Sequence, residues 1–170
     1  PVFNADKEVS NIYKTNNKIF NKLNKKLPKY IFSFPIDKNE IATAILSNKT
    51  NLKKIITIIH KEVRIRMKYF LKKNKKSKIV ILDIPLLLEN KINNKHDILI
   101  FVDSKKKDIE KRIKKRVNFN RKLLNKFKKI QLSSAYKKKK SDFIIKNDFT
   151  KKSVKNSVKK ILNKIFKWKK

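Results

Sequence analysis

Two carboxylates flank a proline turn that follows an apolar run in this sequence. Asp83 ends the run at 79–83, and Glu89 follows the Pro85-Leu86-Leu87 segment. Such a run is typical of a strand buried in a parallel sheet, and ligands of open parallel sheets bind beyond the carboxyl ends of the strands. We therefore expect Asp83 at a ligand-binding edge. Glu89 either positions a substrate or fixes the turn.

Three arginines lie close together in a chain that otherwise uses lysine. Only five of the 49 basic residues are arginine, and Arg112, Arg116 and Arg121 are three of those five. A planar guanidinium clamps phosphate oxygens with two parallel hydrogen bonds, which an ammonium cannot do. The segment is therefore a candidate phosphate-binding site. The alternative is ordinary charge on a helix surface.

Other residue types are scarce, and their scarcity excludes several chemistries within these 170 residues. Two histidines, His60 and His96, and no cysteine rule against a His/Cys zinc site and against thiolate catalysis. The absence of glycine excludes every glycine-dependent phosphate loop. His60 falls on a predicted helix, where it either packs or contacts a substrate.

The apolar pattern alternates between short runs and longer stretches with helical periodicity, which predicts an α/β fold with a mostly parallel sheet. The expected strands are 2–3, 78–83, 98–102 and 142–146. The expected helices are 5–24, 38–47 after an Asp37 cap, Thr50 to about 72, 105–117, 120–139 and 151–167. No apolar run approaches the roughly 20 residues of a membrane span. We expect one domain over residues 1–170, no signal peptide and a cytoplasmic protein.

The formal net charge of +36 suggests a nucleic-acid-binding protein. However, the basic residues are spread along the whole chain, and arginine, the residue best suited to bidentate contacts with guanine and phosphate, is rare. Lys, Asn, Ile and Phe have codons rich in A and T, so base composition also explains the lysines. The run Lys137–Lys140 is expected to be a solvated helix end.

Several segments, in order, resemble the dephospho-CoA kinase family. Pro1-Val-Phe-Asn-Ala-Asp6 resembles its P-V-[ILF]-D-A-D segment, and Asp83-Ile-Pro-Leu-Leu-Leu-Glu89 its D-[IV]-P-L-L-[FLY]-E segment. Arg112-Ile-Lys-Lys-Arg116 is similar to the R-[LI]-x-x-R of its lid, and Ser141-Asp-Phe-Ile-Ile-Lys-Asn147 to its A-D-[FY]-[IV]-I-x-N. His60 and Gln131 also match in position. The resemblance covers nearly the whole chain.

The resemblance implies a P-loop kinase-like parallel sheet flanked by helices, with a helical CoA-binding region at 20–75 and a lid at 112–138. The family's first strand and its G-x-x-x-x-G-K-[ST] loop precede the segment that starts here. That strand is usually central, so we expect the strands at 79–83 and 98–102 to lack their shared neighbour. We also expect the chain to be inactive as it stands.

The same resemblance implies the activity, transfer of a phosphoryl group from ATP with Mg²⁺ to the ribose 3′-hydroxyl of dephospho-CoA. It makes Asp6 the general base or the group that orients the hydroxyl. It assigns substrate binding to His60, Asp83, Pro85, Leu86 and Glu89, and ATP binding to Arg112, Arg116, Arg121 and Asn147.

Two positions depart from the family. Asn4 replaces its first aspartate, and Phe149 replaces a downstream glycine. We expect a monomer that binds dephospho-CoA and ATP and binds neither a membrane nor nucleic acid. The alternatives are a basic nucleic-acid-binding protein and a pseudo-enzyme that binds CoA.

Overall fold

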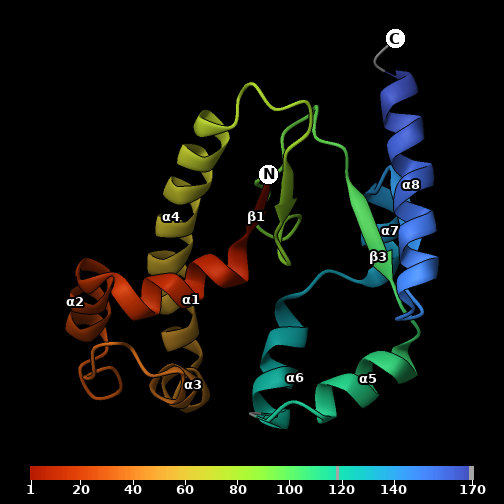
Figure 1. The fold of residues 1–170 in the computed structure, drawn as a ribbon. Helices are drawn as coiled ribbons and strands as arrows, with labels where there is room; N and C mark the ends of the chain where they lie inside the picture. The colour runs from red at the N-terminus through yellow and green to blue at the C-terminus, as the bar shows by residue number, and fades with distance from the viewer. Residues whose placement is uncertain (118, 169–170) are drawn as a thin grey trace. The chain divides into compact units, whose positions relative to one another are not determined.

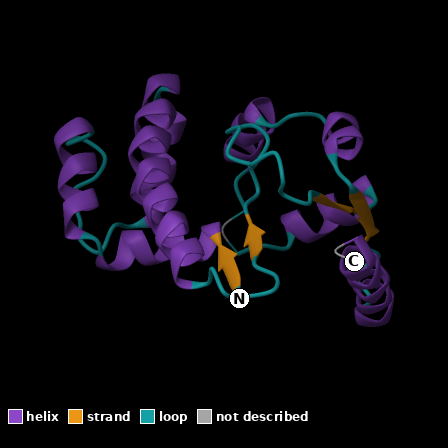
Figure 2. Ribbon diagram, turned by 90° about the horizontal axis from the view of Figure 1, so that it is seen from above, coloured by secondary structure: helices purple, strands orange, loops and turns teal. Residues whose placement is uncertain are grey.

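The chain folds into two compact units, Pro1–Pro85 and Leu86–Lys170, in a computed structural model that describes residues 1–117 and 119–168. Each unit contains a two-stranded parallel sheet and its own helices. Figure 2 draws the strands of both sheets in orange. The α/β class expected from the sequence is confirmed.

The first unit places four helices between its two strands. In chain order these elements are β1 (Val2–Asn4), α1 (Ala5–Thr15), α2 (Asn17–Lys26), α3 (Lys38–Ser47), α4 (Lys49–Lys73) and β2 (Ile81–Asp83). The parallel pairing sets Val2 opposite Ile81 and Asn4 opposite Asp83. Since parallel strands need a crossover connection, the helices supply it. Figure 1 shows α1 lying across the long helix α4.

The core of this unit has two parts that hold β1 and the helices in place. Phe3, Ala5 and Met67 form a buried cluster, with Phe70 tilted against Phe3 at 5.5 Å between ring centroids. Ile12, Leu23 and Ile31 are the largest fully buried side chains. They come from α1, α2 and the following loop, so burial of apolar surface joins these segments.

The second unit builds its sheet from β3 (Ile100–Asp103) and β4 (Phe143–Lys146). Three short helices separate the strands, α5 (Lys106–Lys114), α6 (Arg121–Ile130) and α7 (Ser134–Lys140), and α8 (Lys151–Trp168) follows β4. Ile145 of β4 packs with Ile161 and Ile165 of α8 in a small buried cluster.

Two expected helices are each broken by a capping residue, so those predictions were wrong. The helix predicted for 5–24 divides at Asn16, whose Oδ1 accepts from the N–H of Ile19 at 3.1 Å. The helix predicted for 120–139 ends at Ile130 and restarts after Ser133, whose hydroxyl accepts from the N–H of Tyr136. Asn and Ser side chains compete with helix continuation and favour cap positions.

The cap of α3 is confirmed, and that of α4 is not. Asp37 accepts from the N–H of Asn39, as expected for a helix over 38–47. The cap of α4 is Asn48 rather than Thr50, and Thr50 is its backbone donor at 2.9 Å.

The strands are short and half exposed, not buried as their apolar runs predicted. Ile81 in β2 is 53% exposed, and Ile100 and Val102 in β3 are exposed as well. Among the described residues, each strand pairs with one neighbour only. Since a two-stranded sheet leaves an edge and much of a face uncovered, these apolar side chains reach solvent.

In the part of the chain that the structure describes, no helix is both long enough and apolar enough to cross a membrane.

Candidate active site

Three polar residues of the first unit, Asn4, Asp6 and Asp83, lie at the carboxyl edge of the β1–β2 sheet. Asn4 and Asp83 are register partners at the strand ends, and Asn4 Nδ2 donates to Asp83 Oδ2 at 2.6 Å. Asn4 Oδ1 accepts from the N–H of Lys7 at 2.8 Å, which caps α1. Asp6 lies in the first turn of α1 with an exposed side chain. Its carboxylate is therefore at the positive end of the helix dipole, which stabilises negative charge.

An ion-pair network fixes the helix that carries Asp6. Arg66 of α4 donates to Glu8 of α1 at 3.1 Å and to Glu62, one turn earlier in α4, at 3.3 Å. Asn16 Nδ2 also donates to Glu62 at 3.1 Å. All four side chains are only partly exposed. The network therefore joins both ends of α1 to α4.

Sequence reasoning missed this network. The Glu62-to-Arg66 spacing of four residues was its one local signal.

The other two site residues predicted in the first unit lie on different elements. His60 is half-buried in the middle of α4, and Pro85 is exposed two residues after β2. The structure thus brings Asp6 and Asp83 to one sheet edge, together with Asn4.

Glu89 forms an ion pair and a hydrogen bond with other residues of the second unit. Its Oε1 accepts from Lys137 Nζ at 2.6 Å and from the N–H of Leu132 at 3.0 Å, while its side chain is 9% exposed. Burial raises the pKa of Glu89, but the hydrogen bonds from Lys137 and Leu132 lower it by more, so the pKa lies below its ordinary value. Its Oε2 is buried and has no hydrogen-bond partner among the described residues.

Leu86 belongs to the same turn region as Glu89. Its carbonyl oxygen accepts from Asn90 Nδ2 at 2.7 Å, which closes the turn that follows Pro85. The Leu86 side chain is half-buried.

Arg112 forms one wall of an open pocket of about 320 Å³ in the second unit. Its guanidinium carbon lies 4.4 Å from the centroid of the Phe149 ring. The residues that line the pocket combine cations, carboxylates and one aromatic ring: Asp108, Lys111, Arg112, Lys115, Asp148 and Phe149. Cation–π stacking on one face leaves the N–H edge of the guanidinium available to a ligand.

Two consecutive polar residues shape the turn that presents Phe149. Asn147 Oδ1 accepts from the N–H of Phe149 at 2.8 Å, and Phe149 adopts a positive φ of 65°. Asp148 accepts from the N–H and hydroxyl of Thr150, and these hydrogen bonds lower the pKa of Asp148. Asn147 therefore stabilises the turn that presents Phe149.

The other two arginines do not line this pocket. Arg116 lies in the bend after α5, and Arg121 is the first residue of α6, both with exposed side chains. The run Lys137–Lys140 was predicted to be a solvated helix end, and that prediction is wrong for two of its lysines. Lys137 pairs with Glu89, and Lys138 Nζ lies 2.7 Å from Asp103 Oδ2.

Comparison with known proteins identifies the family to which these two sets of residues belong. The family model described as dephospho-CoA kinase matches residues 1–153. The chain belongs to the dephospho-CoA kinase family. It is 32% identical over 166 residues to the dephospho-CoA kinase of Wolbachia pipientis wMel, with 96% of this chain and 85% of the relative covered. It is 36% identical over 113 residues to that of Fusobacterium nucleatum, with 66% and 58% covered.

A solved structure has the same fold. The protein titled "Crystal structure of TT1252 from Thermus thermophilus" superposes with a TM-score of 0.72 at 19% identity, covering 96% of this chain and 84% of that chain. As a member of the dephospho-CoA kinase family, the chain is an ATP-using kinase of CoA biosynthesis, as the sequence predicted.

Proposed function

We propose that the carboxyl edge of the β1–β2 sheet binds the acceptor in the phosphorylation of the ribose 3′-hydroxyl of dephospho-CoA by ATP, which yields CoA. The observation that supports this proposal is the placement of Asp6 and Asp83 at that edge, with Asn4 hydrogen-bonded to Asp83 at 2.6 Å. Ligands of open parallel sheets bind at such edges.

In this proposal Asp6 is the general base. Its exposed carboxylate accepts the proton of the 3′-hydroxyl while the hydroxyl oxygen bonds to the γ-phosphorus of ATP. The bond from that phosphorus to the bridging oxygen breaks, and ADP leaves with the electron pair. Glu8, Arg66 and Glu62 keep α1, and therefore Asp6, in place.

The donor set at this edge is compatible with Mg²⁺ bound through water and substrate phosphates. Proteins bind Mg²⁺ through one or two carboxylates, with waters and phosphate oxygens completing the shell. Asp83 supplies such a carboxylate, and its Oδ2 is oriented by Asn4. A bound Mg²⁺ would neutralise charge on the phosphates. Groups of three or more His, Cys, Asp or Glu able to hold a metal do not occur among the described residues.

On the nucleotide side, Arg112, Arg116 and Arg121 contact phosphate oxygens of ATP in this proposal. Support comes from Arg112, whose stacking on Phe149 holds the plane of its guanidinium at an open pocket. Asn147 shapes the loop beside the same pocket. In this proposal residues 112–138 form the lid.

Three further residues contact the substrate in this proposal, and a fourth, Glu89, positions one of them. His60 and Pro85 belong to the first unit, and residues 20–75 form its acceptor-binding helical region. Leu86 contacts the substrate from the turn that Asn90 closes, and Glu89 acts by fixing that turn.

The test is release of ADP that depends on dephospho-CoA. The family's phosphate loop needs glycine, and these 170 residues contain none. The assay therefore uses the chain joined at Pro1 to the family's first strand and phosphate loop. Asp6→Asn should lower kcat by about 100-fold or more, with little change in KM for dephospho-CoA. Asp37→Asn is the matched control, because Asn also caps a helix well. ADP release that does not depend on dephospho-CoA, or full activity in Asp6→Asn, would reject the proposal.

We further propose a monomer that acts in the cytoplasm and has no nucleic-acid partner. A net charge of +36 makes two copies repel each other, which opposes self-association.

A further inference from the structure

The side chain of Arg112 is held by an aromatic ring rather than by a carboxylate. The Phe149 ring lies under its guanidinium, with 4.4 Å between the guanidinium carbon and the ring centroid. Within residues 1–117 and 119–168, the Arg112 side chain forms no ion pair and no hydrogen bond. A carboxylate would take up the N–H groups of the guanidinium, whereas a ring contacts only its face. The stack therefore leaves these donors to a ligand.

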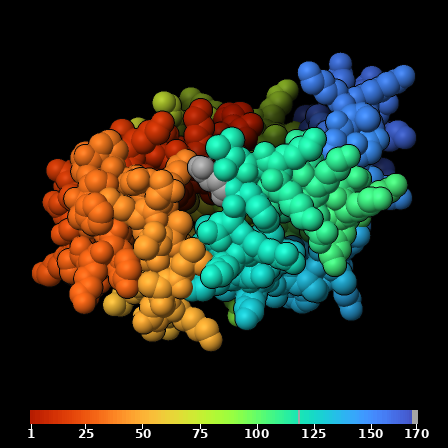
Figure 3. All heavy atoms as spheres, turned by 90° about the horizontal axis from the view of Figure 1, so that it is seen from below, coloured from red at the N-terminus to blue at the C-terminus, as the bar shows by residue number. Residues whose placement is uncertain are grey.

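Asp108 is the carboxylate with which Arg112 would otherwise pair. The two residues lie four apart on α5, with the acid nearer the N-terminus, and this spacing and order favour an ion pair on a helix. Both are described residues that line the same pocket, and no ion pair joins them. No residue of α5 is buried, and the helix lies at the molecular surface in the green part of Figure 3. Packing in a core therefore does not keep the two side chains apart.

The second carboxylate of the pocket, Asp148, is engaged by its own turn. It accepts from the N–H of Thr150 at 2.9 Å and from the hydroxyl of Thr150 at 2.8 Å. Asn147 Oδ1 accepts from the N–H of Phe149 in the same turn. Phe149 has a positive φ of 65°, and its side chain is 39% exposed. The turn, rather than burial in a core, therefore places the ring against Arg112.

We infer that Phe149 is a positioning residue for ATP, because its ring keeps Arg112 out of an ion pair with Asp108 and presents the guanidinium to phosphate. This inference rests on the proposed function, in which Arg112 contacts a phosphate of ATP. Glycine, which the family pattern has at this position, carries no side chain that could stack. Lys111 and Lys115 line the same pocket and add positive charge that attracts the same anion. Phe149 thus gives this chain a means of orienting Arg112 that glycine cannot supply.

The first test is the KM for ATP in the ADP-release assay of the extended chain. Phe149→Gly and Phe149→Asn should each raise this KM by about 3-fold to 10-fold and change kcat little, because they remove binding that ground state and transition state share. Glycine and asparagine adopt positive φ readily, so the melting temperature should stay constant or rise. A merely structural role predicts instead that a variant of unchanged stability keeps its KM.

Two matched variants accompany this test. Phe149→Tyr keeps an aromatic face under the guanidinium and should keep the KM for ATP of the unchanged chain. Phe166→Ala removes a phenylalanine that is 46% exposed on α8, outside the pocket, and it should also leave this KM unchanged. A raised KM in Phe149→Tyr would overturn the role given to the ring.

The second test removes the competing carboxylate. Asp108→Asn should lower the KM for ATP by a larger factor in the Phe149→Gly background than in the chain with Phe149, because Asp108 pairs with Arg112 only where the ring is missing. A general change in the charge of the pocket would lower the KM by the same factor in both backgrounds, since independent effects add. Equal factors would therefore overturn the inference.

A third measurement observes Arg112 directly in the 170-residue chain. The sequence contains five arginines, so NMR can resolve their Nε–H signals, and Arg112→Ala identifies the signal of Arg112. The ring current of Phe149 should displace that signal, and Phe149→Gly should abolish the displacement. A signal that is the same in both chains would show that the ring does not hold Arg112.

The kinetic outcomes separate this inference from the function on which it rests. If Arg112→Ala raises the KM for ATP and Phe149→Gly leaves it unchanged, this inference alone is overturned. If neither change affects the KM, the contact between Arg112 and ATP in the proposed function is rejected as well.

Discussion

Asn4 shows how a single amide can serve two neighbours at a sheet edge. Its Oδ1 caps α1 at the N–H of Lys7, and its Nδ2 donates to Asp83. An aspartate here, as the family pattern has, would place a second carboxylate in register with Asp83 and would lack the donor. Two negative charges so near each other would repel, so an amide at position 4 suits the hydrogen bond to Asp83.

Phe149 replaces a glycine of the family pattern, and two of its contacts offset part of the cost of its positive φ. A non-glycine residue at a positive φ of 65° costs about 1–2 kcal/mol. The hydrogen bond from its N–H to Asn147 Oδ1 and the stacking against Arg112 offset part of that cost. The turn therefore forms here without the glycine.

Tyr13 provides a pH-dependent prediction at the residue scale. Burial raises the pKa of Tyr13 from 10.0 to about 12. The unfolded chain ionises Tyr13 first, so the free energy of unfolding should fall as pH rises from about 10 to about 12, by roughly 2 kcal/mol from this residue. Denaturant unfolding of the chain and of Tyr13→Phe checks this. The difference in stability between the two should change across that pH range and be constant below it.

At the scale of elements, one buried carboxylate joins the turn after Pro85 to the segment between α6 and α7. Glu89 accepts from Leu132 and pairs with Lys137. Lys138 makes a similar link from α7 to Asp103 at the end of β3. Two of the four consecutive lysines therefore hold elements of the second unit together.

Glu89→Gln should destabilise the chain by about 1–3 kcal/mol, because it removes the ion pair and leaves the Lys137 ammonium without its partner. The pKa of Glu89 is lowered in the folded state, so its stabilisation is present above the ordinary carboxyl pKa and is lost as pH falls through the lowered value. Thermal unfolding near pH 7 measures the effect. The exposed Glu110→Gln is the matched control and should unfold like the unchanged chain. Equal melting temperatures for the two variants would contradict the role given to Glu89.

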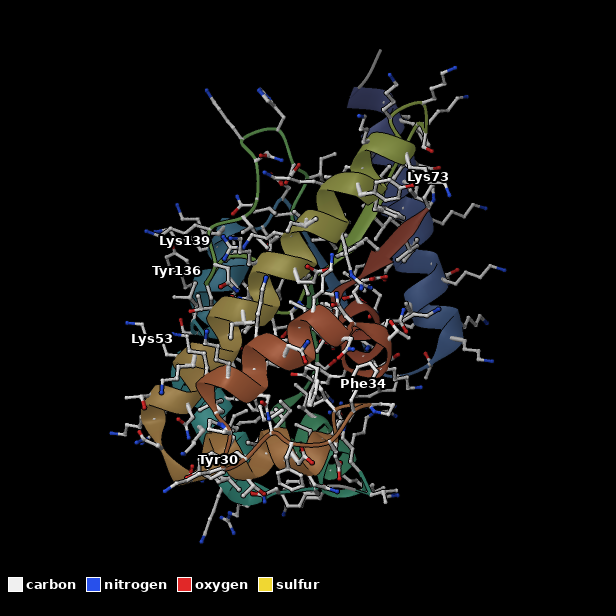
Figure 4. The ribbon with its side chains drawn as sticks, turned by 90° about the vertical axis from the view of Figure 1, so that its left-hand side faces the viewer. Tyr30, Phe34, Lys53, Lys73, Tyr136 and Lys139 are labelled. Carbon is white, nitrogen blue, oxygen red and sulfur yellow. The ribbon has the colours of Figure 1, made fainter. Side chains whose placement is uncertain are left out.

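At the scale of the whole molecule, net charge is the dominant feature. The chain carries 49 basic and 13 acidic residues. Lysines such as Lys53, Lys73 and Lys139 extend into solvent in Figure 4. Self-repulsion of this kind destabilises the compact state, and salt screens it.

The melting temperature should therefore rise by about 5 °C or more between roughly 0.05 M and 0.5 M sodium chloride. Differential scanning calorimetry at constant pH measures it. A melting temperature that stays constant or falls over this range would show that the lysines are far enough apart not to repel.

The sequence by itself determined the family, the α/β class and the features that depend on near neighbours. The helix at 38–47 with its Asp37 cap is such a feature, since the cap bonds two residues away. The same is true of the strand segments near 81, 100 and 144, whose apolar side chains are consecutive. It also placed Asp6 and Asp83 near strand ends, because parallel strands end at a common edge.

Only the tertiary structure decided which distant side chains meet. Asn4 meets Asp83 across 79 residues, and Arg66 meets Glu8 across 58. Nothing local marks Lys137 as paired and Lys139 as solvated, and nothing local shows that Ile81 stays exposed. Periodicity predicts which face of an element is apolar, but burial and ion pairing depend on the elements that pack against that face. Those contacts exist only once the chain has folded.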